Sequence, residues 1–143
     1  MSTASDPLPP EPGWKVLYIE DHPVNMALVE SILEAYPLIR FLKASTGREG
    51  VRLAQSETPD VVLLDMRLPD IGGLEVVRAL SEQISRQRLR VVLLTADSFS
   101  IDVVKAMSLG ATAYWRKPLT VDAAVGGLRR LLGDRPFEDG PLA

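Results

Sequence analysis

Residues 61–73 read Val-Val-Leu-Leu-Asp-Met-Arg-Leu-Pro-Asp-Ile-Gly-Gly. The continuous apolar run at the start is typical of a strand that is covered on both faces, as in a parallel sheet. Pro69, Gly72 and Gly73 then predict a turn. Asp65 ends the apolar run, and a buried carboxylate is unfavourable unless it has a partner. The stretch therefore predicts a buried parallel strand that delivers an acidic side chain to a site.

Strand-like and helix-like segments alternate along the chain on both sides of that stretch. This alternation predicts an α/β fold with helices on both faces of a parallel sheet. Right-handed crossovers leave few topologies, and for a (βα)5 chain the flavodoxin-like, doubly wound order 2-1-3-4-5 is the common one. The predicted strands are residues 15–20, 39–44, 61–65, 90–95 and 112–116.

The segments between the strands have helical periodicity, and their apolar stripes favour packing against the sheet. A second helix is predicted around residues 48–55, although Gly47 and Gly50 weaken it. The stripes in the other four helices are Val24, Leu28, Ile32 and Tyr36; Leu74, Val77, Leu80 and Ile84; Ile101, Val104 and Met107; and Val121, Val125, Leu128 and Leu132.

Length and composition predict one domain, residues 14–133, between two tails. The chain has 143 residues, enough for a single domain with a core of its own. Residues 1–13 hold four prolines and predict a flexible N-terminal arm, and residues 134–143 predict a flexible C-terminal tail.

Charge and residue usage exclude several classes of function. The net charge of -3 gives no general attraction to nucleic acid or to an anionic membrane, and we interpret Arg86, Arg88 and Arg90 as a solvated patch. The absence of cysteine excludes disulfides and thiolate chemistry, and a single His22 argues against a histidine-bound zinc site. There is no signal pattern and no run of ~20 apolar residues, so we expect a cytoplasmic protein.

Polar residues end or directly follow four of the five predicted strands. Carboxyl ends of parallel strands meet at one edge of the sheet, and in this topology ligands bind at the crevice between strands 1 and 3. Two carboxylates ~4 Å apart repel by about 4 kcal/mol at an effective dielectric near 20, so a cation is needed, and Mg²⁺ suits carboxylate and phosphate oxygens. The residues concerned are Glu20, Asp21, Asp65, Thr95 and Lys117.

Each of these residues also has a simpler interpretation when it is taken alone. Asp21 could cap the helix that starts near Pro23, and Thr95 could cap the next helix together with Asp97 and Ser98. Lys117 could be a solvated surface charge. It is the combination, in this order along the chain, that indicates a site for a phosphoryl group with a bound metal.

Four segments together resemble the receiver domain of two-component response regulators, over residues 14–133. They are Val-Leu-Tyr-Ile-Glu-Asp-His-Pro-Val-Asn, Val-Val-Leu-Leu-Asp-Met-Arg-Leu-Pro-Asp-Ile-Gly-Gly-Leu-Glu, Val-Val-Leu-Leu-Thr-Ala and Gly-Ala-Thr-Ala-Tyr-Trp-Arg-Lys-Pro-Leu. The resemblance implies that Asp65 accepts a phosphoryl group from a phosphohistidine on a sensor histidine kinase or a histidine phosphotransfer protein. It also implies a signalling switch that catalyses only its own phosphorylation and dephosphorylation. Because no output module follows Asp134, we expect the receiver to be stand-alone.

The resemblance assigns a role to each further site residue. Asp21 would bind Mg²⁺ directly, Glu20 would act through water, and the backbone carbonyl of Arg67 would be another metal ligand. Lys117, whose bond to Pro118 is usually cis in the family, would contact the phosphoryl group.

The remaining assignments concern the phosphate oxygens and the switch. Thr95 and the amide of Ala96 would bind phosphate oxygens, and Tyr114 would turn inward as Thr95 moves. The switched, partner-binding surface would be formed by the fourth helix, the fifth strand and the fifth helix.

Departures and alternatives remain at this point. Gly72 stands where the family commonly has an acid, and Arg67 and Asp97 suggest, as a hypothesis, a charged lid over the site. His22 invites a proton-transfer role, although a solvent-facing loop residue is the simpler interpretation. A receiver of a hybrid histidine kinase is one alternative. A Mg²⁺-dependent aspartyl-phosphate phosphatase is a weaker alternative, because Arg67 stands where such enzymes usually have a second Asp. A flavin-binding flavodoxin-like protein is also weak, because acids follow the first strand in place of a hydroxyl- and glycine-rich phosphate loop.

Overall fold

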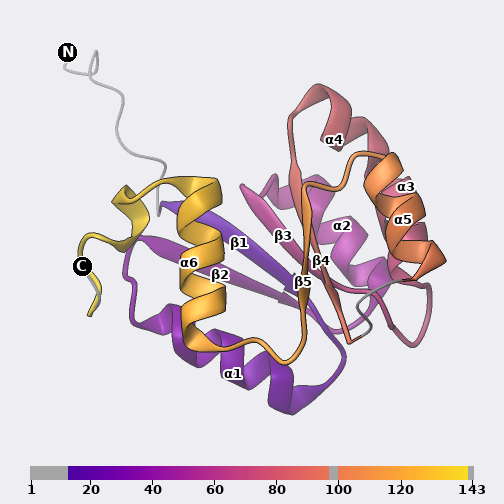
Figure 1. The fold of residues 1–143 in the computed structure, drawn as a ribbon. Coiled ribbons are helices and arrows are strands. Elements are labelled where there is room, and N and C mark those ends of the chain that lie inside the picture. The colour runs from indigo at the N-terminus through magenta and orange to yellow at the C-terminus, as the bar shows by residue number, and fades with distance from the viewer. Residues whose placement is uncertain (1–12, 97–99, 142–143) are drawn as a thin grey trace.

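The computed structural model of the protein describes residues 13–96 and 100–141. Five parallel strands form one sheet in the order β2-β1-β3-β4-β5, which confirms the predicted topology (Figure 1). The crevice between β1 and β3 therefore lies where the chain reverses its direction of winding. The strands are β1 (Trp14–Ile19), β2 (Ile39–Ala44), β3 (Val61–Asp65), β4 (Arg90–Thr95) and β5 (Ala113–Arg116).

Helices cover both faces of this sheet, as Figure 1 shows. α1 and α6 pack on one face, and α2, α3 and α5 pack on the other. All five residues of β3 are buried, as its continuous apolar run predicts. The helices are α1 (Pro23–Glu34), α2 (Gly47–Glu57), α3 (Gly73–Ala79), α4 (Ser81–Arg86), α5 (Ile101–Ser108) and α6 (Val121–Leu132), followed by the 3-10 turn η1 (Arg135–Phe137). Within the described part of the chain, no helix is both long and apolar enough to cross a bilayer.

The third predicted helix is divided in two. Leu80 ends α3 and begins α4 with φ -97° and ψ 7°, outside the helical range, and its side chain is fully buried. None of the residues of α4 is buried. The single stripe from Leu74 to Ile84 is therefore wrong as one helix: Leu80 is anchored in the core at the break, and Ile84 beyond it packs against the core only in part.

The predicted apolar stripes are wrong in part for three helices. In α1 the predicted positions are spaced by four and drift about 40° per step around a helix of 3.6 residues per turn, whereas in α5 they are spaced by three and drift about 60° the other way, so both stripes leave the buried face. α1 instead buries Val29 and Leu33, and α5 buries Val103 and Ala106. The predicted stripe residues that the structure exposes are Val24 (69%), Leu28 (43%), Ile101 (64%), Val104 (44%) and Val121 (48%).

The C-terminal segment from Asp134 packs against the domain, in contrast to the predicted flexible tail. Phe137 of η1 is fully buried, and its ring lies edge-on to Tyr36 at 5.1 Å between centroids. The guanidinium of Arg129 lies over the same ring, 5.3 Å from its centroid. One large aromatic residue therefore holds a segment whose prolines and glycine suggest a tail. The predicted N-terminal arm lies, except for Gly13, outside the described residues.

Candidate functional site

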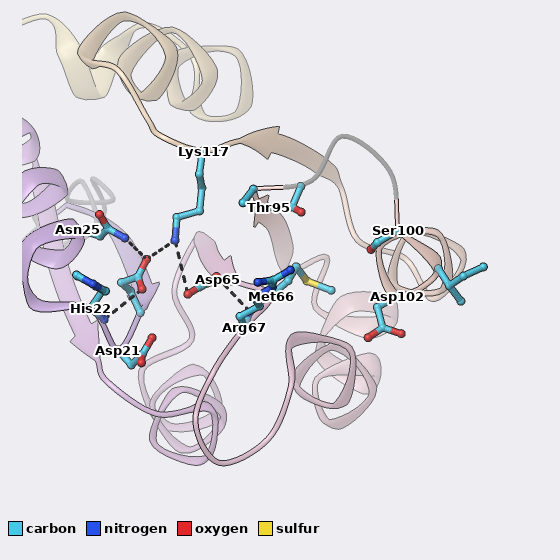
Figure 2. Close-up of a pocket in the computed structure, with 13 residues that line it drawn as sticks. Asp21, His22, Asn25, Asp65, Met66, Arg67, Thr95, Ser100, Asp102 and Lys117 are labelled. Carbon is cyan, nitrogen blue, oxygen red and sulfur yellow. Dashed lines mark hydrogen bonds and ion pairs between the residues drawn. The ribbon is translucent and has the colours of Figure 1, made fainter.

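Four strand ends meet around a cavity of about 570 Å³ at the carboxyl edge of the sheet. Its lining includes residues that the sequence predicted for the site: Glu20, Asp21, Asp65, Arg67, Thr95, Ala96 and Lys117. Figure 2 shows Lys117 extending from the segment after β5 toward Asp65, with Asp21 across the cavity. The structure therefore brings these residues of the prediction together, and it places Tyr114 outside the cavity lining.

Three carboxylates form the acidic part of the cavity. One oxygen from each of Glu20, Asp21 and Asp65 lies within 4.8 Å of the other two. Glu20 and Asp65 are buried, whereas Asp21 is exposed. This donor set of hard oxygen ligands beside an open cavity fits Mg²⁺, which binds a few carboxylates and keeps several waters.

Lys117 supplies a positive charge to these acids. Its Nζ lies 2.9 Å from Oε1 of Glu20 and 3.6 Å from Oδ2 of Asp65. Its bond to Pro118 is cis, as the resemblance implied. Lys117 is half-buried and lines the cavity, so its ammonium contacts the acids and remains accessible from the cavity.

Glu20 is held by more donors than the sequence suggested. The hydroxyl of Tyr18 and the amide of Asn25 donate to Oε1 at 2.8 Å and 3.4 Å, and the backbone N–H of His22 donates to Oε2 at 3.2 Å. Burial raises the pKa of Glu20, but the bonds from Lys117 and Tyr18 outweigh it and hold the pKa below its usual range. Burial also raises the pKa of Tyr18, and Glu20 adds to that rise. Sequence reasoning missed Tyr18, which the alternation of β1 places on the same face as Glu20.

The pKa of Asp65 is shifted in the opposite direction from that of Glu20. Burial raises the pKa of Asp65 to about 6, and Glu20 adds to the rise, while the N–H of Arg67 and the ammonium of Lys117 oppose it. The N–H of Arg67 donates to Oδ1 of Asp65 at 3.2 Å. Oδ2 faces Lys117, so the two carboxylate oxygens of Asp65 have different environments.

The β4 side of the cavity carries the predicted alcohol. Thr95 is buried at the end of β4 and lines the cavity with Ala96. α5 is capped by Ser100, whose hydroxyl accepts the N–H of Val103, and Ser100 also lines the cavity although the sequence did not indicate it. Ser100, rather than Thr95, is therefore the residue that caps α5. Asp97 and Ser98 lie outside the described residues, so the lid that Asp97 would form with Arg67 stays a hypothesis.

Two predicted residues lie on the surface. Tyr114 on β5 is 47% exposed, and its role in a switch stays a prediction. His22 is exposed at the start of α1 and also lines the cavity, so both interpretations of it stay predictions.

Comparisons with known proteins agree with this geometry. The model of the response regulator receiver domain matches residues 16–127. The polar-differentiation response regulator DivK of Brucella ovis is 32% identical over 121 residues, which covers 83% of this chain and 96% of DivK.

Solved structures with the same fold include other receivers. The chemotaxis protein CheY4 of Vibrio cholerae superposes with a TM-score of 0.76 at 26% identity, over 84% of this chain and 99% of that one. The receiver domain of a sensor histidine kinase from Pseudomonas aeruginosa, solved with magnesium in its active-site cleft, superposes with a TM-score of 0.75 at 29% identity, over 85% of this chain and 98% of that one. With the family model covering most of the chain, the protein belongs to the response regulator receiver domain family.

Proposed function

We propose that the protein accepts a phosphoryl group on Asp65 from a phosphohistidine of a sensor histidine kinase or histidine phosphotransfer protein. The observation that carries this proposal is the convergence of Glu20, Asp21 and Asp65 within 4.8 Å, with Lys117 Nζ 3.6 Å from Asp65. Such a group of acids beside one ammonium suits phosphoryl transfer, which depends mainly on positioning and charge neutralisation.

Asp65 acts as the nucleophile in this proposal. A carboxylate oxygen of Asp65 forms a bond to phosphorus while the bond from phosphorus to the donor imidazole nitrogen breaks, and the imidazole keeps that electron pair. Arg67 holds Oδ1 through its backbone N–H, and Lys117 offers its ammonium to the oxygens of the arriving group. Since attack needs the ionised form, the pKa of about 6 leaves most of Asp65 reactive at neutral pH.

The residues present also define where Mg²⁺ would be held. Asp21 and Asp65 would bind it directly, Glu20 would act through water, and the carbonyl of Arg67 would be a further ligand. When bound, the ion neutralises the charge that the phosphoryl oxygens bring to the acids. The Pseudomonas receiver with magnesium in its cleft supports this choice of ion.

Phosphorylation would then act through the β4–β5 side of the site. The acyl phosphate adds negative charge, which the hydroxyl of Thr95 and the amide of Ala96 would bind, and movement of Thr95 would make room for Tyr114. We propose that this changes the surface of α5, β5 and α6, which a partner reads. Ile101, Val104 and Tyr114 are exposed there.

The proposed activity is self-modification rather than turnover of a metabolite, in a cytoplasmic signalling protein without a nucleic-acid partner. We propose a stand-alone role, as the match covers 96% of DivK. A receiver of a hybrid kinase is the second candidate, because the Pseudomonas neighbour is part of a sensor histidine kinase.

Incubation with acetyl phosphate and Mg²⁺, followed by intact-mass analysis, tests the proposal. The wild type is expected to gain one labile phosphoryl group, and Asp65→Asn none. Asp102→Asn is the matched control, because Asp102 also lines the cavity but lies outside the acidic group. Unlabelled wild type, or labelling that persists in Asp65→Asn, would reject Asp65 as the acceptor. Steady hydrolysis of phosphate esters would instead support a phosphatase.

A further inference from the structure

The core-facing side of Glu20 is occupied by a tyrosine. Tyr18 and Glu20 are two residues apart, which places them on the same face of the sheet. The ring of Tyr18 is buried beside Phe41, with 6.5 Å between ring centroids, and its hydroxyl lies 2.8 Å from Oε1 of Glu20. A core residue thus reaches the bottom of the acidic site with a hydrogen-bond donor.

The donors to Glu20 are divided unequally between its two oxygens. Oε1 accepts from Tyr18, Lys117 and Asn25, whereas Oε2 accepts from the N–H of His22. An ionised carboxylate has about two acceptor positions on each oxygen. Oε1 is therefore fully used, and Oε2 keeps acceptor capacity for a cation or for a water bound to one.

We propose that Tyr18 is a positioning residue for the magnesium site: its hydroxyl fixes Glu20 with Oε1 bonded to Lys117 and Oε2 available to a water bound to the ion. This inference rests on the proposed function. The other side-chain donors to Oε1 are less constrained, because Lys117 and Asn25 are only half-buried. Tyr18 is 1% exposed and packed on the sheet, so it is the donor whose position the fold determines.

The competing explanation is that Tyr18 only fills the core and its hydroxyl is satisfied by a convenient acceptor. Tyr18→Phe separates the two, since it keeps the ring and removes the hydroxyl. Mg²⁺ titrations of the wild type and the variant, followed by the NMR shifts of backbone amides, give a dissociation constant that does not depend on phosphoryl transfer. Loss of a group that orients a metal ligand commonly weakens metal binding 10- to 100-fold, and we expect a dissociation constant about tenfold higher.

A second readout separates affinity from chemistry. In acetyl phosphate labelling, Tyr18→Phe should need about tenfold more Mg²⁺ for half-maximal rate, and its rate at saturating Mg²⁺ should stay within about twofold of wild type. Tyr36→Phe is the matched control: Tyr36 is a buried tyrosine of the same core cluster outside the cavity lining, and its Mg²⁺ affinity should not change.

The possible outcomes are distinct. A folded Tyr18→Phe that binds Mg²⁺ within twofold of wild type overturns the inference and leaves the proposed function intact. A variant that loses its cooperative unfolding transition assigns the hydroxyl to stability and also overturns it. Wild type that neither binds Mg²⁺ nor is labelled overturns the proposed function, and this inference with it.

Discussion

The Nζ atom of Lys117 lies 2.9 Å from Oε1 of Glu20, a residue 97 positions away in the sequence. Its distance to Asp65 is longer, 3.6 Å. Lys117 is therefore bonded mainly to the more buried acid, where it balances a charge that the core would otherwise leave unpaired. In this arrangement Lys117 both stabilises the site and faces the cavity that would receive the phosphoryl group.

Replacing Lys117 with methionine should lower stability and activity together. Removing one partner of a buried ion pair commonly destabilises by about 3–5 kcal/mol, and loss of one charge-stabilising donor slows reactions about 10²-fold or more. Urea unfolding and the rate of acetyl phosphate labelling measure the two effects. Lys43→Met is the control, because the pair of Lys43 with Glu30 is largely exposed and is worth under about 1 kcal/mol. Equal stability of the two variants would contradict the role of Lys117 in the core.

The ionised carboxylate of Asp65 should lower the free energy of unfolding. Its pKa is about 6 in the folded state and 3.8 ordinarily, so between about pH 4 and pH 6 the unfolded chain loses this proton first and stability falls as pH rises. Above pH 6 the full penalty, on the order of 2–3 kcal/mol, is present. Asp65→Asn should therefore be more stable than wild type at pH 7.5 without Mg²⁺, and similar to it near pH 3.5.

Urea unfolding at both pH values measures this effect, with the exposed Asp139→Asn as the control. Added Mg²⁺ should raise the melting temperature of wild type more than that of Asp65→Asn. A variant less stable than wild type at pH 7.5 would show that Lys117 and Arg67 fully compensate the burial of Asp65.

Asp70 connects the loop after β3 to the start of α2. Its carboxylate accepts the N–H groups of Gly47 and Arg48 at 2.8 Å and 2.9 Å. Although desolvation raises the pKa of Asp70, these backbone bonds lower it to about 2. The resulting stability is present above pH 4 and is lost as pH falls toward 2. The melting temperature of wild type should therefore fall more steeply than that of Asp70→Asn over this range. Parallel curves would show that the bonds from Gly47 and Arg48 to Asp70 do not contribute to stability.

The strands and the convergence of the candidate site residues were predictable from the sequence, since both depend on local signals and on one topological rule. The apolar runs and polar ends identify the strands, and parallel strands bring Glu20, Asp65 and Lys117 to one edge. Helix faces were less predictable, because Val24 and Val29 are equally apolar and only the orientation of α1 on the sheet selects between them. Phe137 was missed because a single aromatic residue carries no periodicity.

Phe137→Ala tests how far the C-terminal segment contributes to the domain. Removing a fully buried phenylalanine ring typically costs about 3–5 kcal/mol, and here it also removes the contacts with Tyr36 and Arg129. Urea unfolding should show a loss of this size. Val24→Ala, at a position that is 69% exposed, should change stability by less than about 0.5 kcal/mol. A similarly small change in Phe137→Ala would show that the C-terminal segment contributes little to the stability of the domain.

Two neighbouring glycines of α6 should respond to alanine in opposite directions. A Cβ at Gly127 would overlap the ring of Trp115, whereas a Cβ at Gly126 would meet only the guanidinium of Arg130 at 3.7 Å. Alanine is about 1 kcal/mol more favourable than glycine inside a helix, so Gly126→Ala should stabilise the protein by up to that amount. At Gly127 the same gain is opposed by overpacking of about 1–3 kcal/mol, and the net effect should be destabilising.

A double-mutant cycle with Trp115→Leu assigns the Gly127 effect to this contact. If the indole ring is the obstacle, Gly127→Ala should be less destabilising, or stabilising, in the Trp115→Leu background, while Gly126→Ala should have the same effect in both backgrounds. Urea midpoints of the six proteins in the two backgrounds supply the coupling energies. A Gly127→Ala penalty that persists without the indole would place its cause in the backbone of α6 rather than in its packing on β5.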